Sequence, residues 1–301
     1  MNSTARCSRD VSPMSWTHLL TQDGSYTFFS SEFGEAFHSR QGAKTEAFQK
    51  FADATRLAQK AQQPSLKLLD VCYGLGYNTA AALEVIWAVN PACRVELYGL
   101  ELDATVPMSA IALLEPWAAP IQEVLTTLAK HQVCQHSTLE ARVLIGDARQ
   151  TIQSLMQGGF QADAIFLDPF SPRRCPQLWT VDFFQRVASC LAQTGILSTY
   201  SRSASVRTAL IEAGLKIGTI PLGEVHGSHD WAQGTIAAWG GELLEPLSQM
   251  EQEHLQTRAA IPYRDPCLND GAETILARQA QEQRSVTVES TSSWRRRWGI
   301  S

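Results

Sequence analysis

Short apolar runs and helical patterns alternate along the middle of the chain. The apolar runs, each of a length typical of a buried strand, fall at residues 66–71, 94–100, 141–145, 162–167 and 195–200. Two further strands are expected at residues 214–220 and 235–239, on either side of a polar loop. This alternation predicts an α/β fold: a mostly parallel sheet with helices on both faces, ending in a hairpin of the last two strands.

The first sixty residues follow a different pattern. Asp23 and Gly24 stand between segments rich in threonine and aromatic residues, which predicts a β-hairpin, and residues 42–60 space their apolar side chains as one helical face. We divide the chain into an N-terminal hairpin and helix, a core, and a helical and partly disordered tail, at residues 1–63, 64–241 and 242–301.

Two roles are open for the N-terminal part. It is either a small subdomain that packs on the core, or a lid that closes over the turn at residues 68–83 with Phe37, His38, Ser39 and Glu46.

The segment at residues 68–83, LLDVCYGLGYNTAAAL, predicts a strand, a tight turn and a helix. Gly74 and Gly76 fall in the turn, and Asn78 begins the helix with capping chemistry. Glycines let the backbone approach a ligand closely, and a helix start presents unpaired N–H groups. Thr79 stands where a dinucleotide-binding turn needs its third glycine, so a dinucleotide is disfavoured. A cofactor turn and an ordinary tight turn both fit.

Acidic residues follow three of the predicted strands. In a doubly wound sheet, ligands bind beyond the carboxyl ends of the strands. Glu101, with Asp103 as its competitor, is placed to accept hydrogen bonds from ribose hydroxyls, and Asp147 either meets an adenine amino group or caps the next helix. Asp168 ends a buried strand, and three prolines within the next eight residues stiffen the loop around it, which favours catalysis.

Composition narrows the class of protein. The 301 residues carry a net charge of −5, which argues against broad non-specific binding of nucleic acid but leaves room for local basic patches. No stretch has the length of a membrane span or the pattern of a signal peptide, so we expect a cytoplasmic protein. The seven cysteines are scattered without a Cys-x-x-Cys pair, so we expect no metal site.

The end of the chain looks disordered from Gln279 onwards. Its segment at residues 293–298, SWRRRW, combines basic and aromatic residues and is either an RNA contact or a charged tail.

The segment FLDPFSPRRCPQLWT, which contains Asp168, resembles the signature of the tRNA wobble-uridine methyltransferases that complete 5-methylaminomethyl-2-thiouridine. FHSRQGAKTE, DVCYGLGYN and STYSRSASVRTALIEAGLKIG are similar to other segments of that family, so the likeness spans roughly residues 25–240. Asp70, Cys72, Gly74 and Gly76 stand on the four fixed positions of motif I of class I S-adenosylmethionine-dependent methyltransferases, with Cys72 in place of the first glycine.

The resemblance implies S-adenosylmethionine as the cofactor and the anticodon region of tRNA as the partner. In many bacteria the domain is fused to an FAD-dependent oxidase, which we expect this chain to lack together with its oxidoreductase activity. Asp168 is the expected catalytic residue. The expected cofactor contacts are Asp70, Cys72, Gly74, Gly76, Asn78, Glu101 and Asp147. The expected substrate contacts are Phe37, His38, Glu46, Phe170, Arg173, Arg174, Arg202 and Arg207.

The expected reaction is N-methylation of the aminomethyl group of 5-aminomethyl-(2-thio)uridine at the tRNA wobble position. Residues 226–231, HGSHDW, depart from the family's Lys-Arg-Glu-Met-like segment, so substrate contacts are expected to differ there. Two alternatives stay open. One is an aminopropyltransferase similar to spermidine synthase, or another amine methyltransferase; the other is a non-catalytic RNA-binding module on the same fold.

Overall fold

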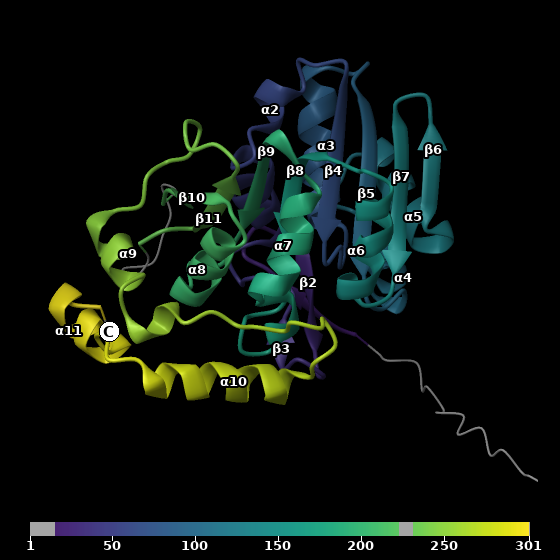
Figure 1. Cartoon of the computed structure of the whole chain (residues 1–301). Coiled ribbons are helices and arrows are strands. Elements are labelled where there is room, and N and C mark those ends of the chain that lie inside the picture. The colour runs from purple at the N-terminus through teal and green to yellow at the C-terminus, as the bar shows by residue number, and fades with distance from the viewer. Residues whose placement is uncertain (1–15, 223–230, 301) are drawn as a thin grey trace, which may run out of the picture.

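The computed structural model describes residues 16–222 and 231–300, so most of the 226–231 segment, where substrate contacts are expected to differ, lies outside it. Within the described residues, the strands of the central sheet have the order β10-β11-β9-β8-β4-β5-β7-β6 (Figure 1). Their bounds are β4 Ser65–Val71, β5 Arg94–Glu101, β6 Val133–His136, β7 Leu139–Ile145, β8 Ala162–Leu167, β9 Leu191–Thr199, β10 Lys216–Ile220 and β11 Gly234–Ala238. Strands β4, β5, β7, β8 and β9 are parallel, and β10 and β11 form the predicted hairpin.

Strand β4 shows why these apolar runs become central strands. Successive side chains of a strand point to opposite faces. Leu66 and Leu68 pack in one core cluster, and Leu69 and Val71 pack in a second cluster on the other face. The first cluster packs under α3 (Tyr77–Val89) and α5 (Ala119–His131), and the second under α6 (Ala148–Gln157), α7 (Val181–Ser189) and α8 (Ala204–Glu212). The predicted fold, a mostly parallel sheet covered on both faces, is confirmed.

The N-terminal part forms a small antiparallel sheet of β1 (Thr17–Leu20), β2 (Tyr26–Ser30) and β3 (Glu35–Ala36), with the predicted turn at Asp23 and Gly24. The single helix expected at residues 42–60 is instead α1 (Ala43–Glu46), the π-helix η1 (Ala47–Asp53) and α2 (Leu57–Lys60). Arg56 adopts a left-handed conformation before α2, and the Ser198 hydroxyl donates a hydrogen bond to the Lys50 carbonyl within η1. These features interrupt the α-helical pattern.

Other elements complete the core. Helix α7 ends at Ser189, because Leu191 already pairs with Ala162 in the sheet. Strand β6, which the apolar pattern did not predict, pairs antiparallel with β7. The region before β6 contains α4 (Thr105–Ala110) and the 3₁₀ helix η2 (Ile111–Leu113).

The C-terminal segment is ordered, so the prediction of disorder from Gln279 is wrong. It contains α9 (Gln249–His254), the 3₁₀ helix η4 (Arg258–Ala260), α10 (Ala272–Ser285) and α11 (Thr291–Trp298), and Figure 1 shows α10 crossing the lower part of the molecule. The segment is held by buried contacts that its polar sequence does not reveal: Trp294 is 1% exposed and stacks on His254 at 4.1 Å. No helix in the described part of the chain is long and apolar enough to cross a membrane.

Candidate active site

Two cavities meet at the carboxyl ends of the central strands. The first, which we call the glycine-turn cavity, is lined by Trp16, Ser30, Glu32, Phe33, Phe37, Cys72, Gly74, Glu101, Leu102, Asp103, Val106, Asp168, Phe170, Cys175 and Leu178. The second, which we call the Glu46 cavity, is lined by residues 35–40, Glu46, Lys50, residues 168–171 and Tyr200.

The glycine turn after β4 requires glycine at both predicted positions. Gly74 and Gly76 have φ angles of 56° and 82°, in the left-handed region that glycine tolerates. A Cβ atom on Gly76 would lie 2.8 Å from the Tyr73 hydroxyl, and one on Gly74 would lie 3.5 Å from the Phe37 ring. The turn therefore brings bare backbone to the wall of the cavity, directly before α3.

Cys72 also adopts a left-handed conformation, with φ of 69°, although it carries a side chain. The backbone N–H groups of Cys72 and Tyr73 both donate to the Leu100 carbonyl, at 3.0 and 2.9 Å, and hold the turn in place. Its half-buried side chain lies on the cavity wall, and burial raises the pKa of its thiol well above the usual range, so the thiol stays protonated.

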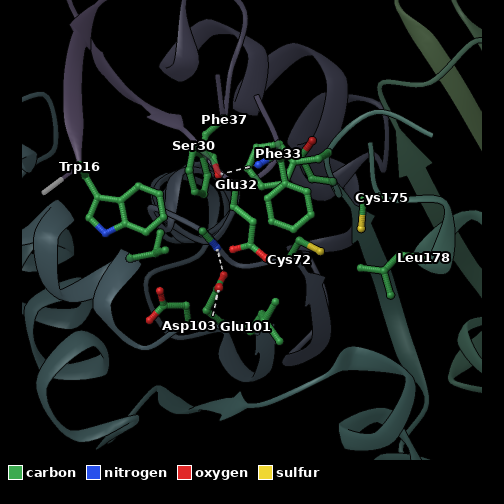
Figure 2. A pocket seen from close by; sticks show the side chains of 15 residues that line it. Trp16, Ser30, Glu32, Phe33, Phe37, Cys72, Glu101, Asp103, Cys175 and Leu178 are labelled. Atoms are coloured by element: carbon green, nitrogen blue, oxygen red, sulfur yellow. Dashed lines mark hydrogen bonds between the residues drawn. The ribbon is translucent and has the colours of Figure 1, made fainter. Parts of the chain in front are cut away.

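Glu101 lies at the end of β5. Its carboxylate accepts a hydrogen bond from the glycine turn and also lines the glycine-turn cavity. Its Oε2 accepts a hydrogen bond from the Gly74 N–H at 2.7 Å, and its Oε1 accepts one from the Asp103 N–H at 2.9 Å. Burial raises the pKa of this carboxyl. Each carboxylate oxygen has a second lone pair, so Glu101 keeps acceptor capacity for ligand hydroxyls. Figure 2 shows Phe33, Phe37 and Trp16 of the N-terminal part around the same cavity as Glu101 and Cys72.

Asp70 and Asn78 do not line the glycine-turn cavity. Their side chains instead form hydrogen bonds with other residues of the protein. Asp70 is fully buried, and its Oδ2 accepts a hydrogen bond from the Thr79 hydroxyl at 2.8 Å. Burial raises the pKa of Asp70 to about 7. The Asn78 side chain donates its hydrogen bond to Asp168 at 2.9 Å, so its observed partner is the predicted catalytic residue.

Asp168 lies on the wall that the two cavities share. Its loop is fixed from three directions. The Tyr200 hydroxyl donates to the Pro169 carbonyl at 2.8 Å, and the Trp179 indole donates to the Phe170 carbonyl at 2.8 Å. The Ser171 N–H donates to Glu35 of β3 at 2.9 Å. The carboxylate is therefore held in one position relative to both cavities.

Burial raises the pKa of Asp168 well above the usual carboxyl range, and the negative charge of Glu46 raises it further, while the hydrogen bond from Asn78 opposes the shift. Glu46 itself forms an ion pair with Lys50 one helical turn later and accepts a hydrogen bond from the Ser39 N–H at 3.1 Å. A carboxyl with a raised pKa is a stronger proton acceptor once ionised, so Asp168 suits acid–base chemistry.

The structure brings the predicted residues Phe37, His38, Glu46 and Phe170 together with Asp168 in the Glu46 cavity. Phe170 stacks on Phe33 at 4.4 Å and meets Phe37 edge-on at 4.9 Å, which gives the site an aromatic wall. Burial lowers the pKa of His38 to about 4, so its ring is neutral, and Nδ1 lies 3.0 Å from the Thr27 hydroxyl.

Sequence reasoning missed other lining residues. Tyr200 follows β9, so the rule that ligands bind beyond strand ends could have found it. Lys50 lies four residues after Glu46, a helical spacing that pairs opposite charges. Trp16 and Phe33 reach the glycine-turn cavity from the N-terminal part, and no local signal in the sequence indicates this.

The predicted arginines differ in their placement. Arg173 and Arg174 are exposed on the Asp168 loop. Arg202 lies over the Trp231 ring at 4.2 Å and donates to the Ala232 carbonyl at 3.3 Å.

Arg207 is fully buried, and the prediction that it contacts substrate is wrong. Its Nη2 forms an ion pair with Glu251 of α9 at 2.7 Å, and its Nε donates to the Thr235 hydroxyl at 2.9 Å. The guanidinium is therefore used within the protein, where no phosphate can reach it.

Asp147 caps α6 by accepting a hydrogen bond from the Arg149 N–H at 2.9 Å, so one of its two predicted roles is present. It is absent from the residues that line the two cavities described above, and a contact with adenine stays a prediction. Among the described residues, no group of three or more histidine, cysteine, aspartate or glutamate side chains is placed to hold a metal ion.

The fold and the site together define a class I S-adenosylmethionine-dependent methyltransferase. A family model described as "S-adenosyl-L-methionine-dependent methyltransferase" matches residues 113–223. The chain is 32% identical to MNMC2 from Aquifex aeolicus, whose crystal structure it matches with a TM-score of 0.78 over 90% of this chain and 86% of that one. The chain belongs to the MnmC methyltransferase family, and S-adenosylmethionine is its methyl donor.

Curated relatives extend the comparison. The chain is 30% identical over 248 residues to the tRNA 5-methylaminomethyl-2-thiouridine biosynthesis bifunctional protein MnmC of Acidovorax, a match that covers 78% of this chain and 37% of the relative. The chain thus spans about a third of the length of that bifunctional protein. It is also 26% identical over 271 residues to an uncharacterised protein of Methanocaldococcus jannaschii, covering 86% of this chain and 70% of that protein.

Proposed function

We propose that the protein transfers a methyl group from S-adenosylmethionine to the primary amine of 5-aminomethyl-(2-thio)uridine at the wobble position of tRNA. The observation that carries this proposal is the position of Asp168 on the wall between the glycine-turn cavity and the Glu46 cavity. A methyl transferase needs the donor on one side of the acceptor nitrogen and a proton acceptor close to that nitrogen.

The glycine-turn cavity fits the cofactor. Gly74 presents bare backbone to this cavity for the methionine part, and Glu101 retains acceptor capacity for the ribose hydroxyls. When bound, S-adenosylmethionine supplies a methyl group on a positively charged sulfur. Cys72 contributes a protonated thiol to the same wall, and because only a thiolate is a good nucleophile, this side chain does not compete with the substrate amine for the methyl group.

The Glu46 cavity fits the amine of the substrate. An alkylamine is mostly protonated at neutral pH, since the reference pKa of lysine is near 10.4, and nitrogen must lose a proton before its lone pair can attack carbon. Asp168 accepts this proton while Asn78 holds the carboxylate in place at 2.9 Å. The negative charge of Glu46, balanced in part by Lys50, favours entry of a cationic amine.

Several features support RNA as the carrier of that amine. Phe37, Phe170 and Tyr200 present aromatic surface to a nucleobase in the cavity. Arg173 and Arg174 stand exposed on the same loop as Asp168, where phosphates of a bound strand would pass. The names of the bifunctional relatives point to the same tRNA modification, and we place the protein with its tRNA in the cytoplasm.

The N-terminal part contributes to both cavities: Phe37 lines both of them, and Glu46 lines the second. We therefore propose that the N-terminal part that the structure describes, residues 16–63, is the lid over the core at 64–241 rather than a subdomain that only packs on it.

The proposal is tested by incubating the protein with methyl-labelled S-adenosylmethionine and three acceptors: tRNA that carries 5-aminomethyl-(2-thio)uridine, the same tRNA with unmodified uridine, and putrescine. We expect label only in the first, in the wobble nucleoside after digestion. Label in putrescine alone would show that the methyl acceptor is a small amine and not tRNA. Absence of label from all acceptors, with the cofactor bound, would favour a non-catalytic RNA-binding role.

A further inference from the structure

The C-terminal segment contacts the start of α6 through Arg149. The Arg149 guanidinium forms an ion pair with Asp265 at 2.8 Å and donates to the Asp270 carbonyl at 2.9 Å. On its other side it contacts both carboxylate oxygens of Asp147, with Nη2 to Oδ2 at 2.7 Å and Nε to each oxygen at 3.1 Å. One mostly buried arginine thus bridges residue 147 of the core and residues 265–270 of the C-terminal segment.

Asp265, which pairs with that arginine, is itself held in place by burial and by hydrogen bonds. Its side chain is fully buried, and its Oδ1 accepts hydrogen bonds from the Asn269 and Asp270 N–H groups, both at 3.1 Å. Its own N–H donates to Asp182 of α7 at 2.6 Å. A buried carboxylate is costly unless it is paired and hydrogen-bonded, and Arg149 supplies the matching charge.

The bridge fixes the direction of the Asp147 carboxylate. Contacts from one guanidinium to both oxygens hold a carboxylate in a defined plane, as a single lysine contact cannot. Asp147 still has 37% of its side chain exposed, and it follows β7, next to the strand that carries Glu101. It therefore retains an accessible edge at the carboxyl ends of the strands, where the adenine end of the cofactor is expected.

We propose that Arg149, held by the buried Asp265, is a positioning residue for Asp147, and that the C-terminal segment is in this way part of the cofactor site. The inference rests on the predicted contact between Asp147 and the adenine amino group. It concerns residues 265–270 of the C-terminal segment, and it gives that segment a role in recognition of the adenine base.

The test compares two ligands of the whole protein by calorimetry: S-adenosylhomocysteine, which carries the 6-amino group, and S-inosylhomocysteine, which carries a carbonyl in its place. We expect the unmodified protein to bind the first at least about tenfold more tightly, the scale of one hydrogen bond to a charged group. In Arg149→Ala and Asp265→Asn this preference should fall to about threefold or less. Arg149→Lys, which keeps the charge but not the two-oxygen contact, should also lose most of it.

Arg264→Ala is the matched control. Arg264 lies in the same segment and pairs with Glu212 and Glu282 on the surface, so its loss weakens docking of the segment without touching Arg149. It should keep the full preference. An unmodified protein without preference, or an undiminished preference in Arg149→Ala and Arg149→Lys, would overturn the proposal. Because no RNA is present, the result is independent of whether tRNA is the methyl acceptor.

Discussion

At the scale of the residue, Cys72 shows how the chain departs from the usual glycine turn. Its φ of 69° costs a residue with a Cβ roughly 1–2 kcal/mol, whereas glycine adopts this conformation without that cost. We expect Cys72→Gly to leave stability within about 1 kcal/mol, because relief of strain is offset by the greater entropy of glycine in the unfolded chain.

Cys72→Val should lose about 2 kcal/mol or more, since a β-branched residue tolerates the left-handed region least. Urea denaturation of the two variants measures the difference. Equal stability of the valine and glycine variants would show that this backbone conformation is not the constraint at the turn.

The pKa of Asp168 gives a second prediction at this scale. The proton acceptor must be ionised, so kcat/KM should rise with pH through the raised pKa of Asp168, well above the usual carboxyl value near 4. Glu46→Gln removes a negative charge that raises this pKa, so the acid limb of the pH profile should move to lower pH. The substrate amine titrates near pH 10, so its effect on the profile is separate from that of Asp168.

Glu84→Gln serves as the control for this profile, because Glu84 pairs loosely with Lys44 at 3.8 Å on the surface of α3. Its acid limb should not move. If the acid limb of the kcat/KM profile lies near pH 4 in the wild type, or does not move in Glu46→Gln, Asp168 is not the proton acceptor.

The sequence located the acids of the site because a general rule applies to them. Glu101 and Asp168 each follow a buried apolar run, and parallel strands bring such residues to one edge of the sheet. Arg207 could not be judged in the same way, because its partner Glu251 lies 44 residues later and nothing local indicates that both are buried. Burial of a charged residue depends on tertiary contacts, which periodicity does not record.

At the scale of the element, the C-terminal helices depend on a few buried polar contacts with the core. Glu251 of α9 accepts hydrogen bonds from Arg207 at 2.7 Å and from the Thr219 hydroxyl at 2.9 Å. Removal of one partner leaves the other charge buried and uncompensated, which costs about 3–5 kcal/mol. We therefore expect Glu251→Gln to lower the free energy of unfolding by an amount in this range, as measured by urea denaturation.

The half-exposed pair of Arg264 with Glu212 provides the comparison, and Arg264→Ala should cost no more than about 1 kcal/mol. Burial acts to raise the pKa of Glu251, but the charge of Arg207 and the hydrogen bonds to the carboxylate outweigh it and lower this pKa. The contribution of this ion pair is therefore present above the unfolded pKa and is lost as the pH falls through the folded one. A Glu251→Gln variant as stable as the wild type at neutral pH would contradict this account of the segment.

The strands and helices of the core were predicted because each carries its own periodicity. Helical structure was expected in the tail from residue 242, but the end of α10 and the whole of α11 were expected to be disordered, because their faces are largely polar and their order comes from single anchors such as Trp294, 1% exposed. Strand β6 was missed for a related reason: it is short and mostly exposed, with one buried residue, Cys134. The apolar pattern of the sequence predicts elements that bury a continuous face. It predicts poorly those elements whose order depends on one contact.

At the scale of the whole molecule, an acidic protein must bind a polyanion through a local basic surface. The net charge is −5, yet Arg173 and Arg174 are exposed beside the shared wall of the two cavities. We expect the double variant Arg173→Ala, Arg174→Ala to weaken binding of tRNA and to reduce the slope of log K against log salt by about one to two, as loss of one or two phosphate contacts requires.

Arg142→Ala is the control for this measurement, because Arg142 is exposed on β7 and pairs with Glu140. It should leave the slope unchanged. An unchanged slope in the double variant, measured by fluorescence titration across salt concentrations, would place the RNA elsewhere on the surface.

The central claim is that Asp168, between the two cavities, takes the proton of the amine while the cofactor is held by other residues. The most direct measurement is single-turnover methyl transfer by Asp168→Asn, together with its affinity for S-adenosylhomocysteine. Asp163→Asn, at the start of the same strand, is the matched control. We predict a rate about 10²–10⁴-fold lower in Asp168→Asn, cofactor affinity within about threefold of wild type, and no change in the control. A rate within threefold of wild type, or a collapse of cofactor affinity, would contradict the account.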